Sequence, residues 1–105
     1  MSPEEHDTIL AYVSHLPHLM AYALMETMPQ KFLEYASTGL KDTTRIAGSS
    51  SKIWSDICLS NSKNLVKALD ELVKNLSSLR KNIVNKEQQN LAHHFTQAKE
   101  KRDAL

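Results

Sequence analysis

The sequence has 105 residues, 41% of them hydrophobic and 24% charged, with a formal net charge of +1. This length fits one domain spanning residues 1–105, and the balanced charge argues against nucleic-acid binding. The two glycines, Gly39 and Gly48, cannot form a glycine-rich phosphate loop. The single cysteine, Cys58, excludes an internal disulfide and is typical of a reducing compartment, so we expect a cytoplasmic protein. No apolar run is long enough to span a membrane.

The first segment is predicted to be a helix with a kink. Ser2 is a suitable N-cap, Pro3 suits the first helical position, and Glu5 stands at the capping-box spacing from Ser2. Pro17 lies inside the helical pattern, removes one backbone donor and predicts a kink just before it. Pro29 should end the helix. The apolar face is formed by residues three or four apart: Ile9, Val13, Leu16, Met20 and Leu24.

The middle of the chain predicts three short helices. The first covers about residues 30–37 and should stop at Thr38 and Gly39, because glycine accepts the left-handed conformation of a helix C-terminus. Residues 41–47 predict one or two helical turns, with Asp42 as a possible cap. Ser51 should cap a third helix. One side of that helix carries three large apolar residues, Ile53, Trp54 and Ile57.

A long heptad-patterned helix is predicted for the C-terminal part. Its apolar residues alternate steps of four and three: Leu65, Leu69, Leu72, Leu76, Leu79 and Ile83. A polar break follows over residues 85–90, where the helix should fold back or pack on a second chain. The fold class is therefore all-α, with a kinked N-terminal helix and a long C-terminal helix. The helices carry more apolar surface than one small chain covers, which predicts a homodimer.

Few polar residues are candidates for chemistry. His15 and His18 are three residues apart, but no third ligand stands nearby, so we expect no metal site. Lys41, Asp42 and Arg45 put two cations and one acid within five residues. They suit either a solvated helix start or a grip on an anion. Trp54 fits either a packing role or the wall of a ligand site, and Cys58, on the same apolar helix, fits a buried packing role rather than a reactive thiol.

Four sequence blocks carry a family resemblance. They are His6-Asp7, SHLPH (14–18), GLKDTTRIA (39–47) and IWSDICLSN (53–61). In order and spacing they resemble the C-terminal half of prephenate dehydrogenase, a pattern shared by arogenate and cyclohexadienyl dehydrogenases. The resemblance implies a helical domain that dimerises and completes the substrate site.

The family's reaction is the oxidative decarboxylation of prephenate to 4-hydroxyphenylpyruvate, in tyrosine biosynthesis. The resemblance implies a separate N-terminal Rossmann domain that binds NAD or NADP and carries the catalytic histidine. Neither that domain nor that histidine is in this sequence, so we expect the chain to have no catalytic or cofactor-binding residue and no activity alone. Its expected partners are a second copy, the nucleotide-binding domain, and prephenate or arogenate, with no nucleic acid and no membrane.

The resemblance gives a substrate-binding role to seven residues: Arg45, Lys41, His18, Asp42, Trp54, Gly39 and Asp7. Arg45 would bind a substrate carboxylate with its planar guanidinium, and Asp42 would orient or pair with it. Trp54 would reach the site of the neighbouring subunit. The family often has two glycines before the Lys-Asp step, and here Thr38 replaces one of them. His6 and His15 suit a structural or a functional role equally.

A second hypothesis is a helical interaction or regulatory module that keeps this fold without the chemistry. A third is an unrelated coiled coil. The third hypothesis predicts that Leu69 and Leu76 matter and that Arg45 and His18 do not.

Overall fold

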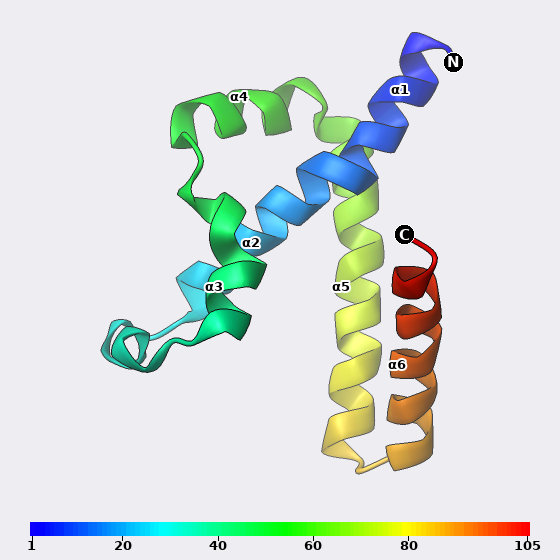
Figure 1. The fold of residues 1–105 in the computed structure, drawn as a ribbon. Helices are drawn as coiled ribbons and strands as arrows, with labels where there is room; N and C mark the ends of the chain where they lie inside the picture. Colours follow the sequence, from blue (N-terminus) through cyan, green and yellow to red (C-terminus); the bar gives the residue numbers. More distant parts are fainter. The chain divides into compact units, whose positions relative to one another are not determined.

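The computed structural model describes residues 1–105 and contains helices and turns but no strands. Its contacts divide the chain into two compact units, Met1–Leu69 and Asp70–Leu105. No helix is both long enough and apolar enough to cross a lipid bilayer. The all-α class predicted from the sequence is confirmed (Figure 1).

The first unit begins with one long helix that bends. It consists of α1 (Pro3–Leu10), a π-helical turn η1 (Ala11–His15) and α2 (Leu16–Thr27). The Ser2 hydroxyl accepts a hydrogen bond of 3.1 Å from the backbone N–H of Glu5, as the capping prediction requires. The predicted disturbance before Pro17 takes the form of the wide turn, in which the Leu16 N–H bonds to the Ala11 carbonyl, five residues back.

Pro29 ends the bent helix as predicted. Met28 is extended, with φ −75° and ψ 123°, because the proline ring disfavours a helical conformation at the preceding residue. A 3-10 helix, η2 (Gln30–Tyr35), follows.

The boundaries predicted for the next elements were wrong by a few residues. Helix α3 (Thr38–Thr44) begins where a helix stop was predicted, and neither glycine has a positive φ. The extended residue Ser37 separates η2 from α3 instead, and its carbonyl oxygen accepts a hydrogen bond from the Lys41 N–H. Asp42 is therefore in the middle of α3 and does not cap it. The helix continues into a 3-10 turn, η3 (Arg45–Gly48).

Helix α4 (Ser51–Ser60) is capped by Ser50, one residue before the predicted Ser51, through a hydrogen bond from the Ile53 N–H. Asn61 joins α4 to the long helix α5 (Ser62–Val84). Within the first unit, α2 packs against both α3 and η3. The buried apolar side chains are few and mostly small: Ala11, Ala21, Leu65 and Ala68.

The second unit contains the rest of α5 and helix α6 (Gln88–Asp103), which runs back alongside it in Figure 1. The reversal falls in the predicted polar break. Lys86 adopts a left-handed conformation there, with φ 53°. The Glu87 carboxylate accepts hydrogen bonds from the amides of Asn85 and Asn90, so the polar residues of the break stabilise the turn.

Candidate functional site

Two histidines flank the junction of the wide turn and α2. His15 is the last residue of η1, and His18 lies in the first turn of α2. The ring nitrogen Nδ1 of His18 lies 2.9 Å from the Ser14 carbonyl oxygen, which fixes the orientation of the ring. Short π-helical segments within α-helices are frequent at functional sites.

Trp54 of α4 packs on both imidazole rings. It stacks on His18, with ring centroids 3.5 Å apart and planes 14° from parallel. It meets His15 edge-on, at 6.1 Å and 76°. The chain that enters α4 is held to α2 by a hydrogen bond of 2.9 Å from the Tyr22 hydroxyl to the Ser49 carbonyl. Trp54 and the two histidines, which are more than 35 positions away in the sequence, thus form one aromatic cluster.

His15 is buried beneath this cluster, with 8% of its surface exposed. The Asn61 side-chain nitrogen Nδ2 lies 3.3 Å from His15 Nδ1 and donates a hydrogen bond of 2.8 Å to the Asp7 carbonyl. Burial lowers the pKa of His15 below its ordinary value of 6.5. The nearby His18 also lowers this pKa, and Asp7 acts in the opposite direction.

This lowered pKa predicts a loss of stability in mild acid. Below pH 6.5 the unfolded chain takes up a proton at His15 before the folded chain does, so the free energy of unfolding should fall as the pH drops through this range. The loss should level off below the folded-state pKa. Urea unfolding at pH 7.5 and 5.5, at one protein concentration, measures the effect. His15→Asn places an uncharged acceptor near the position of Nδ1 and should lose less stability than the wild type. Equal losses would contradict the prediction.

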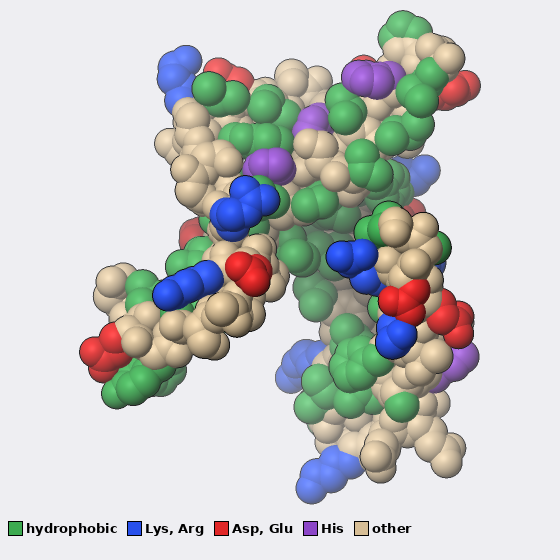
Figure 2. Space-filling view, in the orientation of Figure 1, with side chains coloured by type: hydrophobic (Ala, Val, Ile, Leu, Met, Phe, Trp, Pro, Cys, Tyr) green, Lys and Arg blue, Asp and Glu red, His purple; other side chains and the backbone are tan.

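The charged residues predicted for the site lie on α3 and η3, the two elements that pack against α2. Lys41 and Asp42 are on α3, and Arg45 begins η3. All three side chains are exposed. Figure 2 shows Lys/Arg side chains over α3 and the turn that follows it, and histidine side chains over the adjoining part of the bent helix. The segment therefore presents positive charge next to the histidines.

Asp42 does not form the expected ion pair with Arg45. The ion pairs of the chain are His6–Asp7, Lys52–Asp56 and Lys99–Asp103. Lys41 and Arg45 thus have no carboxylate partner within the chain. The Asp7 carboxylate lies 3.9 Å from His6, and both side chains are well exposed, so it is the Asp7 backbone that joins the buried network.

Gly39 stands in the first turn of α3. A Cβ atom added at Gly39 would meet no atom within 4 Å, so the fold of this chain does not itself require a glycine there.

The structure thus brings together His18 and Trp54 of one chain, whereas the resemblance gave Trp54 to the site of the neighbouring subunit, and it adds residues that the sequence left open or missed. His15 was left between a structural and a functional role. Asn61 appeared only as the last letter of a sequence block, and Tyr22 was not singled out. An asparagine between two helices has no periodic signal, so only the fold reveals its partners.

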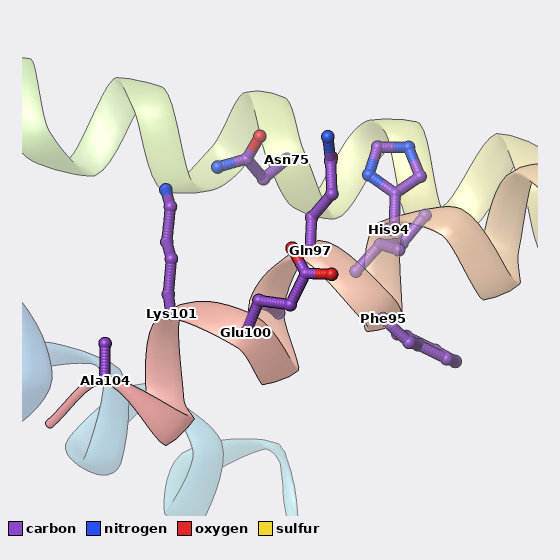
Figure 3. A pocket seen from close by; sticks show the side chains of 9 residues that line it. Asn75, His94, Phe95, Gln97, Glu100, Lys101 and Ala104 are labelled. Atoms are coloured by element: carbon purple, nitrogen blue, oxygen red, sulfur yellow. The ribbon is translucent and has the colours of Figure 1, made fainter.

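A surface groove with a volume of about 730 Å³ lies elsewhere, in the second unit. Figure 3 shows that most of its labelled side chains come from α6, with Asn75 from α5, and that Phe95 projects away from α5. None of the residues predicted for the substrate site lines this groove.

Comparison with known proteins gives the class and then the family. The class is an all-helical dimerisation domain: the family model described as prephenate dehydrogenase, dimerization domain, matches residues 2–97. Because this match covers most of the sequence, the chain belongs to that family.

Related proteins agree with this assignment. The chain is 35% identical to a prephenate dehydrogenase of Bacillus subtilis, and the match covers 100% of this chain and 30% of that protein. It is also 35% identical to a cyclohexadienyl dehydrogenase of Zymomonas mobilis, of which 38% is covered, again with 100% of this chain.

Solved structures show the same fold. Prephenate dehydrogenase from A. aeolicus, in complex with hydroxyphenyl propionate and NAD+, gives a TM-score of 0.88 at 37% identity, over 99% of this chain and 38% of that one. Synechocystis arogenate dehydrogenase gives 0.91 at 26% identity, over 99% and 40%. The chain therefore spans between 30% and 40% of the length of these four relatives.

Proposed function

We propose that this chain is the substrate-binding and dimerisation part of an NAD(P)-dependent dehydrogenase that acts on prephenate or arogenate. In this proposal residues 1–105 work as one functional domain, and a separate nucleotide-binding domain supplies the cofactor site and the catalytic histidine. The relatives named above are longer enzymes of this type, which supports the division of labour. A cytoplasmic location follows from the same biosynthetic role and from the single cysteine.

The stack of His18 on Trp54 is the observation that supports the substrate site most strongly. This stack joins α2 to α4, beside α3 and η3, which carry Lys41 and Arg45. Prephenate has two carboxylates, and a guanidinium without an internal partner suits one of them. Lys41 adds a second cation, and Asp42 and Asp7, the two acidic residues expected at the site, lie on the same unit. The open space beside Gly39 leaves room for a substrate to approach the backbone.

Dimerisation is supported by the apolar residues that α5 leaves exposed. Leu65 is buried and Leu72 and Leu79 are partly covered, but the neighbouring stripe on the same helix is open. Its members are more than half exposed: Val66, Val73, Leu76 and Ile83. Such a stripe costs free energy in water and is removed when a second copy covers it. Dimerisation is the property that the family description names.

An assembled enzyme tests the proposal. The chain joined to a nucleotide-binding domain from a relative should reduce NAD+ or NADP+ when prephenate or arogenate is added, as measured by absorbance of the reduced nucleotide. The chain alone should produce none. An assembled protein that folds and binds the nucleotide, yet turns over neither substrate, would favour a helical interaction module instead.

A further inference from the structure

We propose that Asn61 is a positioning residue that fixes His15 in the tautomer with its hydrogen on Nε2, while the Ser14 carbonyl fixes His18 in the opposite one. The two imidazoles that contact Trp54 would then present different atoms. His15 keeps its acceptor nitrogen occupied by Asn61, and His18 keeps its acceptor nitrogen available. The tautomers follow from hydrogen bonds within the chain, whereas their importance for substrate binding rests on the proposed function.

The orientation of the Asn61 amide is determined by two neighbours. Its nitrogen Nδ2 donates to the Asp7 carbonyl at 2.8 Å. Its oxygen Oδ1 accepts from the Nδ2 of Asn64 at 2.9 Å. Exchanging the amide oxygen and nitrogen would place oxygen against the Asp7 carbonyl and nitrogen against the Asn64 donor. Both contacts would then be repulsive, so the amide has one orientation.

This orientation determines where His15 carries its hydrogen. The group that faces His15 Nδ1, at 3.3 Å, is the Asn61 Nδ2 donor. Two donors cannot share a hydrogen bond, so Nδ1 must be the acceptor and the hydrogen of the neutral ring lies on Nε2. A second proton would have to displace the Asn61 hydrogen bond. The buried position of His15 and the imidazole of His18 both oppose that protonation, and Asp7 is the nearby acid that favours it.

His18 has the opposite arrangement. The partner of its Nδ1 is the Ser14 carbonyl, at 2.9 Å, and a carbonyl oxygen only accepts. The hydrogen therefore lies on Nδ1, and the unprotonated nitrogen is Nε2. One helical turn thus holds two imidazoles whose hydrogens lie on different nitrogens, both in contact with Trp54. In the proposed enzyme, His18 would accept a hydrogen bond at Nε2, and His15 would present its Nε2 hydrogen.

Nitrogen NMR of the histidine-labelled chain tests this assignment without substrate or cofactor. At pH 8 the spectrum should show His15 protonated at Nε2 and His18 protonated at Nδ1. In Asn61→Asp the new carboxylate only accepts, so the hydrogen of His15 should move to Nδ1. The matched control is Asn75→Asp, the same change at an exposed position of α5, and it should leave both tautomers unchanged.

Wild-type His15 protonated at Nδ1, or Asn61→Asp with its hydrogen still on Nε2, would overturn the proposal. If Asn61→Asp loses its helical circular dichroism, the wild-type spectrum and the uncharged Asn61→Ala variant decide. In Asn61→Ala, His15 should lose its single tautomer, and an unchanged tautomer would overturn the role of Asn61. Hydroxyphenyl propionate added to the wild-type sample should shift the ring resonances. Absence of a shift with the expected tautomers would count against the proposed substrate site and leave the assignment standing.

Discussion

Replacing Arg45 with methionine is expected to lower kcat/KM for prephenate by about 10- to 100-fold in the assembled enzyme, mainly through KM. Hydrogen bonds to charged groups contribute about 1.5–3 kcal/mol, and each 1.4 kcal/mol corresponds to about tenfold in affinity. Arg45 is exposed and has no ion pair within the chain, so the substitution breaks no internal ion pair. Initial rates over a range of prephenate concentrations measure the effect.

Two further variants sharpen this test. Lys52→Met removes a positive charge from an exposed residue of α4 whose partner is Asp56, and it should leave KM nearly unchanged. Arg45→Lys keeps the charge but loses the planar fork, and it should fall between wild type and Arg45→Met. If Arg45→Met and Lys52→Met behave alike, Arg45 has no special role and the substrate site must be sought elsewhere.

Replacing Leu76 with glutamate is expected to dissociate the proposed homodimer. Leu76 is 55% exposed and lies in the open stripe of α5. Covering a leucine contributes about 1.5–3 kcal/mol. In a twofold interface the substitution acts on both copies, so the dissociation constant should rise by at least about 10²-fold. Burying the new carboxylates would add to this loss. Sedimentation equilibrium at micromolar concentration measures the change in mass.

The matched control for Leu76→Glu is Lys74→Glu. Residue 74 is on the far side of the heptad pattern from Leu76 and is exposed, so the same acidic side chain should be tolerated there. Circular dichroism should show that both variants remain helical. An unchanged dimer in Leu76→Glu would mean that another face joins the two copies. A wild-type chain that sediments as a monomer would contradict the homodimer itself.

Local sequence signals predicted the outline of the fold well. Ser2 and Pro29 set the limits of the bent helix because a hydroxyl cap and a proline ring act on their immediate neighbours. The polar break near Lys86 likewise marks the reversal between α5 and α6. Gly39 misled the prediction, since glycine permits a left-handed conformation but does not impose one, and α3 starts there instead.

The candidate site was only partly predictable. His18 and Trp54 were both named from the sequence, but their stacking depends on how α4 crosses the bent helix, which no local pattern encodes. The hydrogen-bond network of Asn61 is even harder to predict from the sequence. Its hydrogen bond to Asp7 links residues 54 positions apart, and neither residue type predicts such a bond. Tertiary packing, rather than propensity, decides these contacts.

The wide turn η1 also affects how far α2 is rotated about the helix axis relative to α1. A regular α-helix advances about 100° per residue, so one residue more or fewer rotates everything beyond it by that angle. The turn Ala11–His15 closes its hydrogen bond five residues back instead of four and winds by less than about 100° per residue, so it holds one residue more than a regular turn while His18 and Tyr22 still face Trp54 and Ser49. The irregularity thus lets the chain carry an additional residue at this place while the two helical segments keep their rotation relative to each other.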